Sequence, residues 1–210
     1  DALILVDIQQ IKPKKFQRDV WKAYDNGFHG LLNAPTGSGK TYALWIPIAL
    51  EIFVRNKGDA DKISRSGLQA LWITPLRSLS KEIEKATKEF CLENNLPIEV
   101  GIRTGDTSQS VRARQKRKMP ALLITTPESL HLLLAQKGYA NTFKNLKAIV
   151  VDEWHELIGS KRGVQVELAL SRLKNITTDL RIWGISATIG NLEEASDVLE
   201  AAQLLRSRAV

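Results

Sequence analysis

The chain has 210 residues, of which 43% are hydrophobic and 25% are charged, and its formal net charge at pH 7 is +7. This length suits one α/β domain, or one large and one very small domain, with a full hydrophobic core. No apolar run approaches the roughly 18 residues that a membrane-spanning helix needs, so we expect no membrane partner. Cys91 is the single cysteine, which excludes an internal disulfide and fits a cytoplasmic location.

The predicted strands and helices alternate along the chain. The strands are short, rich in Ile, Val and Leu and not alternating in polarity, which is typical of strands buried on both faces of a parallel sheet. They cover residues 30–33, 70–74, 99–104, 121–125, 148–152 and 181–186. Helical spacing covers residues 42–54, 76–94, 108–118, 128–136 and 164–173. This order predicts an α/β fold, a three-layer αβα sandwich with a mostly parallel central sheet.

Two further segments complete this prediction. Residues 55–67 are polar and contain glycine, so we expect an exposed, mobile loop. Asn191 can cap a last helix that runs to about Leu205, with Glu194 three residues after the cap.

The first predicted strand is followed by Ala-Pro-Thr-Gly-Ser-Gly-Lys-Thr at residues 34–41. This is a phosphate loop, in which backbone N–H groups surround phosphates, a lysine adds positive charge and a threonine hydroxyl binds Mg²⁺. Glycines allow the tight turn, and the following helix directs its N-terminus at the anion. The nucleotide-binding candidates are therefore Pro35, Thr36, Gly37, Ser38, Gly39, Lys40 and Thr41.

Acidic residues follow another buried strand, at Asp152-Glu153-Trp154-His155. Downstream of a phosphate loop, Asp152 is placed to hold Mg²⁺ and Glu153 to activate water. His155 is a candidate relay between the nucleotide and polymer sides, or a polar residue packed at that face.

Three weaker candidates accompany this pair. Ser186 and Thr188 are hydroxyl residues that close the last strand and could bond the carboxylates, although such tripeptides also form ordinary turns. Gln17 carries an amide that could recognise an adenine edge, because it offers both a donor and an acceptor.

A strand-Thr-Pro-helix pattern occurs twice, at residues 70–79 and 121–130. Each copy predicts a helix N-terminus at a strand's carboxyl end, and free N–H groups there can bind backbone phosphates. The alternative is a pair of ordinary capped crossovers. Candidate strand contacts are Thr74, Pro75, Arg77, Arg103, Thr104, Thr126 and Pro127.

Positive charge is densest between residues 103 and 118, which carry a single acid, Asp106. The basic residues are Arg103, Arg112, Arg114, Lys116, Arg117 and Lys118. Charge of this sign favours polyanionic partners. On charge alone, a nucleic-acid contact and a solvated helix face stay equally open.

These motifs resemble the first RecA-like lobe of a superfamily 2 DEXH-box helicase. Within that group the chain is similar to Lhr-type (large helicase-related) enzymes, above all the bacterial ligase-associated DEXH-box helicases. The segments that carry the resemblance are Phe16-Gln17, residues 34–41, Thr74-Pro75-Leu76-Arg77-Ser78-Leu79, Arg103-Thr104-Gly105-Asp106-Thr107, Thr125-Thr126-Pro127-Glu128-Ser129-Leu130, Asp152-Glu153-Trp154-His155-Glu156-Leu157 and Ser186-Ala187-Thr188-Ile189-Gly190.

The resemblance implies an ATP- and Mg²⁺-dependent helicase lobe that moves 3′-to-5′ on single-stranded DNA and acts in DNA repair. Gln17 would bind adenine, Lys40 and Thr41 phosphate and Mg²⁺, Asp152 Mg²⁺, and Glu153 would be the general base. Ser186 and Thr188 would couple nucleotide state to strand movement. Arg77, Arg103, Thr104, Thr126 and Pro127 would lie along the strand. In the parent protein, association with a DNA ligase or nuclease is a further expectation.

On this interpretation residues 1–210 are the helicase ATP-binding domain, and a second RecA-like lobe is absent from the chain. Such a lobe supplies arginine fingers, which are worth about 10³–10⁵ in rate. We therefore expect this chain to bind nucleotide, hydrolyse it poorly and not unwind a duplex by itself. Two alternatives stay open: a helicase for RNA or RNA–DNA hybrids, and a nucleotide-gated clamp without processive movement.

Overall fold

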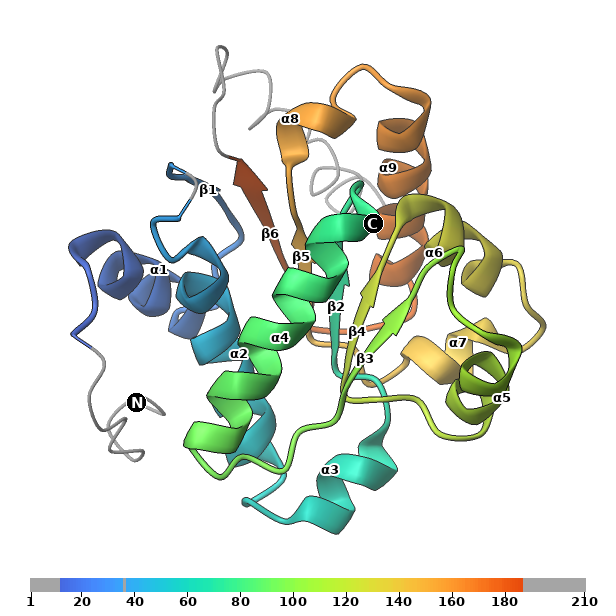
Figure 1. Cartoon of the computed structure of the whole chain (residues 1–210), viewed down its shortest axis with the longest axis horizontal. Helices are drawn as coiled ribbons and strands as arrows, with labels where there is room; N and C mark the ends of the chain where they lie inside the picture. The colour runs from blue at the N-terminus through green and yellow to red at the C-terminus, as the bar shows by residue number, and fades with distance from the viewer. Residues whose placement is uncertain (1–11, 36, 187–210) are drawn as a thin grey trace, which may run out of the picture.

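A computed structural model describes residues 12–35 and 37–186, and its core is a six-stranded sheet (Figure 1). The strands lie in the order β1-β6-β5-β2-β4-β3 and every neighbouring pair is parallel. Their bounds are β1 Gly30–Asn33, β2 Ala70–Ile73, β3 Val100–Arg103, β4 Leu122–Thr125, β5 Ala148–Val151 and β6 Arg181–Ser186. The predicted parallel α/β sheet is confirmed, with each strand within about two residues of its expected place.

Helices connect the strands. Their bounds are α1 Lys15–Asp25, α2 Lys40–Arg55, α3 Ala60–Ser66, α4 Arg77–Glu93, α5 Gln109–Arg117, α6 Pro127–Leu134, α7 Tyr139–Phe143, α8 Trp154–Leu157 and α9 Lys161–Lys174. Within the described ranges, no helix has the length and apolar character that crossing a membrane would require.

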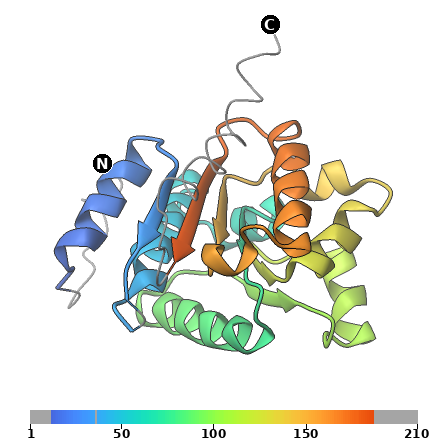
Figure 2. The same ribbon diagram turned by 90° about the horizontal axis from the view of Figure 1, so that it is seen from above.

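The helices cover both faces of the sheet, which gives three layers (Figure 2). On one face α1, α2 and α4 pack around residues such as Trp72 and Val150, and on the other α6, α8 and α9 pack around Leu71 and Ile149. Because successive residues of a strand point to opposite faces, one strand feeds both cores.

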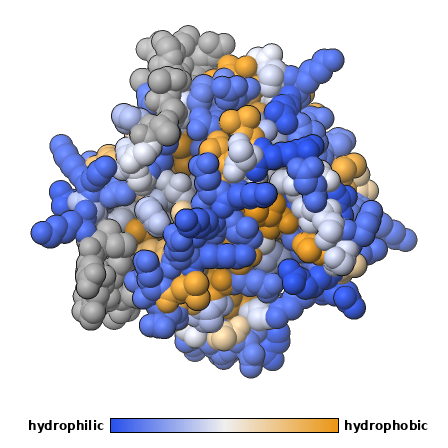
Figure 3. All heavy atoms as spheres, in the orientation of Figure 1, coloured by the Kyte–Doolittle hydropathy of each residue, from blue (hydrophilic) through white to orange (hydrophobic). Residues whose placement is uncertain are grey.

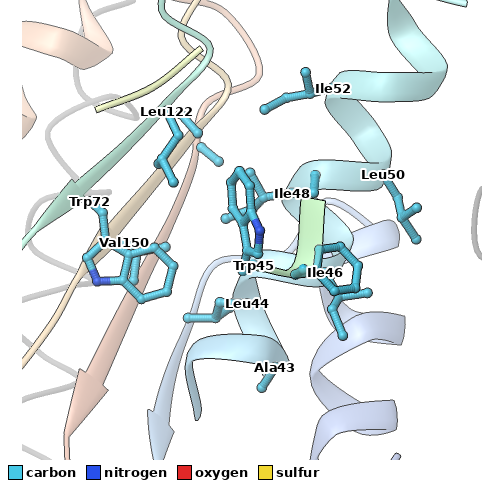
Figure 4. Packing of buried hydrophobic residues seen from close by; sticks show 14 of the residues in the cluster. Ala43, Leu44, Trp45, Ile46, Ile48, Leu50, Ile52, Trp72, Leu122 and Val150 are labelled. Carbon is cyan, nitrogen blue, oxygen red and sulfur yellow. The ribbon is translucent and has the colours of Figure 1, made fainter. Parts of the chain in front are cut away.

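The core on the α2 side is filled by large side chains that interdigitate with the strands (Figure 4). Trp45 of α2 is fully buried, and its indole Nε1 donates to the Thr87 carbonyl of α4 at 3.2 Å. This bond satisfies the indole N–H, which would otherwise be costly to bury. It also fixes α4 beside α2, and those two helices later form two walls of the same cleft.

Two parts of the prediction differ from the structure. The expected loop at residues 55–67 contains helix α3, capped by Asp59, whose Oδ1 accepts from Lys62 N at 3.0 Å. Ile63 anchors this helix in the core and is only 1% exposed. Helices α1, α7 and α8 were not expected, although Phe16 and Gln17 lie in α1. The helix predicted from Asn191 to Leu205 lies outside the described residues.

Because all six strands are parallel, their carboxyl ends meet along one edge of the sheet. Backbone hydrogen bonds join the segments that leave this edge: Ala34 N donates to Ser186 O at 3.2 Å, and Asp152 N to Ile73 O at 2.7 Å. The sequence motifs are thus brought to one side of the molecule, as predicted.

Candidate nucleotide site and strand-end surface

The phosphate loop between β1 and α2 depends on two glycines. Gly37 has φ 74° and Gly39 has φ 94°, both in the left-handed region that glycine adopts without steric cost. A Cβ on Gly39 would also come within 2.9 Å of Gln17 Nε2. Gly39 is the N-cap of α2, so the N–H groups of the helix's first turn are directed at the loop.

Gln17 lies on α1 against the phosphate loop and is buried. Its Nε2 donates to Gly39 O at 3.1 Å, and its Oε1 accepts from Lys14 N at 2.8 Å. In this conformation the amide supports the loop's backbone. Its role in recognising adenine stays a prediction.

Lys40 and Ser38 leave polar atoms buried without partners. Within the described residues, the Lys40 ammonium and the Ser38 hydroxyl have no hydrogen-bond partner. A buried cation without a partner is strongly unfavourable unless an anion binds there. The loop therefore fits a phosphate group. Pro35 is exposed at the loop's entry, and the candidate Thr36 lies outside the described residues.

A cleft of about 350 Å³ opens beside the loop. Thr41, Asp152 and Glu153 line it together with Lys40, so the expected Mg²⁺ ligands and general base share one cavity with the phosphate loop. Helix α4 forms the facing wall with Leu79, Glu82, Ile83 and Ala86. Sequence reasoning missed this wall, since nothing in a generic amphipathic helix indicates which turn will face a ligand.

Asp152 is held in place by both of its carboxylate oxygens. Oδ2 accepts from the Trp72 indole Nε1 at 3.2 Å, and Oδ1 accepts from Glu153 N at 2.9 Å. Burial raises the pKa of Asp152 to about 6, while the Trp72 hydrogen bond and the Lys40 charge act in the opposite direction. The group is therefore ionised at neutral pH and available to a cation. Trp72 was not predicted from the sequence. The sequence indicated only that Trp72 lies in a predicted buried strand, two residues before Thr74.

Glu153 begins α8 with a positive φ of 50°. A non-glycine residue adopts this left-handed region only uncommonly. Its Oε2 lies 3.4 Å from His155 Nδ1, and the same nitrogen lies 2.8 Å from Ser186 Oγ. The structure thus brings together Glu153, His155 and Ser186, whereas Thr188 lies outside the described residues.

The two Thr-Pro segments differ in detail. Thr126 caps α6 as expected, accepting from Ser129 N at 3.4 Å, and Pro127 is the first residue of the helix. At the other segment α4 begins at Arg77, so Thr74 and Pro75 both precede the helix, in contrast to Thr126 and Pro127. Thr74 Oγ1 instead accepts from Leu76 N at 3.4 Å, which turns the chain before the helix.

The candidate residues near these strand ends differ in exposure and in the contacts they make. Arg77 is exposed and its Nη1 forms an ion pair with Asp106 Oδ1 at 2.8 Å. Thr104 is buried, and its Oγ1 accepts from Asp106 N at 3.3 Å. Arg112 donates to the carbonyl oxygens of Thr104, Gly105 and Thr107 at 2.8–3.1 Å, so it holds this loop.

Arg103 differs from the other strand candidates in where its side chain lies. It ends edge strand β3 and lines a separate basic hollow. Burial, and secondly the charge of Arg112, lower its pKa.

Comparison with known proteins shows which helicases this chain is similar to. The chain is 34% identical over 200 residues to the Lhr helicase/uracil glycosylase of Escherichia coli, covering 89% of this chain and 13% of that protein. It is also 34% identical over 182 residues to the ATP-dependent helicase Lhr-Core of Methanothermobacter thermautotrophicus, covering 82% and 21%. The chain therefore spans about a fifth or less of the length of these relatives.

Solved helicase structures are also similar to this chain. The helicase Lhr of Mycobacterium smegmatis, bound to ssDNA and AMP-PNP, superposes with a TM-score of 0.71 at 32% identity, covering 87% of this chain and 24% of that one. The DUF1998 helicase MrfA bound to DNA has a TM-score of 0.78 at 25% identity, covering 95% and 28%. The fold is thus the RecA-like helicase fold. The DEAD/DEAH box helicase family matches residues 14–195, and the chain belongs to that family.

Proposed function

We propose that this chain is the first RecA-like, ATP-binding lobe of an ATP-dependent helicase that moves 3′-to-5′ on DNA. The observation that carries the proposal is the buried Lys40 ammonium, which has no hydrogen-bond partner among the described residues and shares a cleft with Asp152 and Glu153. A cation without a partner and two carboxylates around one cavity are the charges that a metal-bound nucleoside triphosphate requires.

Each residue then has a role. Lys40 and the N–H groups of α2 neutralise and orient phosphates, Thr41 and Asp152 hold Mg²⁺, and Glu153 accepts a proton from the attacking water. When bound, ATP with Mg²⁺ supplies the transferable phosphoryl group and spreads its charge. The Trp72 indole N–H and the Glu153 backbone N–H keep the Asp152 carboxylate oriented without need for rearrangement.

Ser186 is the proposed coupling residue, together with Thr188. Its carbonyl accepts from Ala34 N at the start of the phosphate loop, and its hydroxyl contacts His155, which contacts Glu153. One short chain of contacts therefore joins the loop, the end of β6 and the general base. A change at the phosphates would move the end of β6.

Single-stranded DNA is the proposed polymer, lying along Thr74, Arg77, Thr104, Thr126 and Pro127. We call this set the strand-end surface. The relatives Lhr and MrfA have been solved with DNA, and Lhr with AMP-PNP as well. The polarity, the role in DNA repair and an association with a ligase or nuclease come from the resemblance to Lhr-type enzymes. The cytoplasmic location is proposed from the single cysteine, Cys91. Because those relatives are several times longer, we expect unwinding to need a second lobe.

The test is phosphate release from ATP and Mg²⁺ by this chain, with and without single-stranded DNA, beside Glu153→Gln. Loss of the general base should lower turnover by about 10²–10⁴, while a fluorescent ATP analogue still binds. Glu156→Gln is the matched control, because Glu156 is exposed and contacts the other nitrogen of His155 at 3.6 Å.

Hydrolysis by Glu153→Gln at the wild-type rate would overturn the assignment of the base. Background hydrolysis in all three proteins, with the analogue still bound, would locate the rate-determining chemistry in the second lobe. Matched RNA and hybrid strands at stated salt separate the DNA proposal from the RNA alternative. Strand displacement by the whole parent protein, on substrates with 3′ or 5′ tails, tests polarity and separates a motor from a clamp.

A further inference from the structure

A second hollow lies away from the nucleotide cleft, among α3, α5, α6 and α7. It measures about 250 Å³, and its walls include Gly67, Met119 and Asn145, which precede β2, β4 and β5. The amino ends of parallel strands lie at the edge opposite their carboxyl ends, so these walls lie far from the phosphate loop. Asn145 Nδ2 donates to Ser66 O at 2.8 Å and ties two of the walls together.

The hollow is lined by charge of one sign. Its charged residues are Arg65, Arg103, Lys116, Arg117 and Lys144, and none of the residues that line it is Asp or Glu. We call this set the basic hollow. In the part of the chain that the structure describes, none of the five forms an ion pair.

Several basic side chains elsewhere on the molecule are paired with acidic residues, although others, such as Arg18 and Lys22, form no ion pair within the described residues. Arg55 and Arg181 contact Glu51, Arg162 contacts Glu128 and Lys88 contacts Glu84. In Figure 3 the surface in the view of Figure 1 is mostly hydrophilic, with only small apolar areas between. Five like charges around one concave surface repel each other and focus their field into it, unless an anion enters. The hollow therefore attracts an anion.

The chemistry of the lining favours phosphate. Three of the five cations are arginines, whose planar forks bind phosphate oxygens through paired N–H donors. Asn141, Thr142 and Gln136 add neutral groups able to donate hydrogen bonds. The volume is smaller than the roughly 300–1,000 Å³ of typical small-molecule pockets, which suits a compact charged group.

We propose that the basic hollow binds a phosphate of a nucleic acid, as a second contact separate from the strand-end surface. Arg103 joins the two regions, because it lines the hollow and is followed directly by Thr104. A polyanion that leaves the strand ends at β3 therefore meets this charge next. The proposal rests on the proposed function, since nucleic acid must first bind to the lobe. Contacts of this kind position a strand without reading its sequence.

The test is the double variant Lys116→Gln/Arg117→Gln, at two exposed positions of α5. Gln is used because a new carboxylate would oppose the helix dipole in the last turn of α5. The control, Arg18→Gln/Lys22→Gln, makes the same charge change on exposed positions of α1. Anisotropy of labelled single-stranded and duplex DNA across a salt series gives affinity and its salt slope.

We expect the α5 variant to bind about 2- to 10-fold more weakly and its salt slope to fall by about one to two, while the control changes neither. Strands with and without a 5′-phosphate identify the source. Equal losses assign a backbone phosphate, and a loss confined to the phosphorylated strand assigns a terminal one.

The proposal fails if the α5 variant behaves like the control. If it then also loses affinity for poly-glutamate, the hollow binds an acidic peptide instead. Arg77→Ala separates this failure from that of the proposed function. If Arg77→Ala binds DNA more weakly and the α5 variant does not, the strand-end surface is a binding site and the basic hollow is not. No nucleic-acid binding by the wild-type chain would overturn both.

Discussion

The nucleotide cleft and the strand-end surface lie at the same edge of the sheet, yet they satisfy their polar groups in opposite ways. In the cleft, Lys40 has a buried ammonium without a partner within the described chain, and Asp152 has its pKa raised by burial. At the strand ends, the Thr126 hydroxyl is bonded to Ser129, and Arg77 is paired with Asp106.

This difference indicates how each region responds to a ligand. Burying charge without a partner destabilises the fold, so the cleft is arranged for a ligand that compensates it. The strand-end groups are already satisfied and must exchange internal contacts for phosphate contacts. We therefore expect large effects from single changes in the cleft and small ones at the strand ends.

The largest effect is expected for Lys40→Met, which removes the ammonium and keeps an unbranched apolar stem. Hydrogen bonds to charged groups are worth about 1.5–3 kcal/mol, so affinity for a fluorescent ATP analogue should fall about 10- to 100-fold. The melting temperature of the nucleotide-free protein should stay the same or rise, because a buried charge without a partner has been removed.

Lys22→Met on the exposed face of α1 is the control for a lost surface charge. Analogue titration and thermal unfolding of both variants measure the two effects separately. A large drop in the melting temperature of Lys40→Met would mean that the ammonium stabilises the fold, and the contrast with the strand ends would be wrong.

A second effect concerns stability and its pH dependence. In the folded chain without Mg²⁺ the Asp152 pKa is about 6, against an ordinary value of 3.8. The folded state therefore binds the proton more tightly, and the free energy of unfolding falls as pH rises from about 4 to about 6. Asp152→Asn cannot ionise, so it does not lose stability in this pH range. At pH 7.5 its free energy of unfolding should be about 2–3 kcal/mol higher than that of the wild-type chain.

The difference between the two proteins should shrink as pH falls below about 4, where the aspartate is protonated in both states. Urea unfolding at pH 7.5 and pH 4, without Mg²⁺, measures it. An advantage of Asp152→Asn that is equal at both pH values would exclude titration of this carboxyl as its origin. Phosphate release should be lost in the variant at either pH.

The sheet and most of the cleft could be predicted because they depend on local signals. Glycines at 37 and 39, apolar runs of strand length and acids directly after a strand each act within a few residues. Parallel pairing then brings the strand ends together by topology alone.

Features that depend on packing could not be predicted. Helix α3 has a single buried apolar residue, Ile63, so its sequence shows no helical period. Trp72 reaches Asp152 across 80 residues of sequence, and α4 becomes a cleft wall through its packing against α2, β3 and β4. For the segment of Arg112 the sequence left a nucleic-acid contact and a solvated helix face open, whereas Arg112 itself holds a loop. Charge patterns do not distinguish a phosphate from a backbone carbonyl.

The smallest effect tests the strand-end side of the comparison. Asp106→Asn releases Arg77 from its ion pair, in which the side chains of Arg77 and Asp106 are 59% and 70% exposed. Exposed pairs of this kind contribute about 0–1 kcal/mol, so affinity for single-stranded DNA should rise only about two- to fourfold.

A double-mutant cycle with Arg77→Ala isolates the contribution of the Arg77–Asp106 pair. In the Arg77→Ala background the Asp106→Asn change should have little effect, since no arginine remains to be released. An equal gain in DNA affinity in both backgrounds would mean that Asp106 acts only by repelling the strand, and that the ion pair does not compete with a phosphate for Arg77.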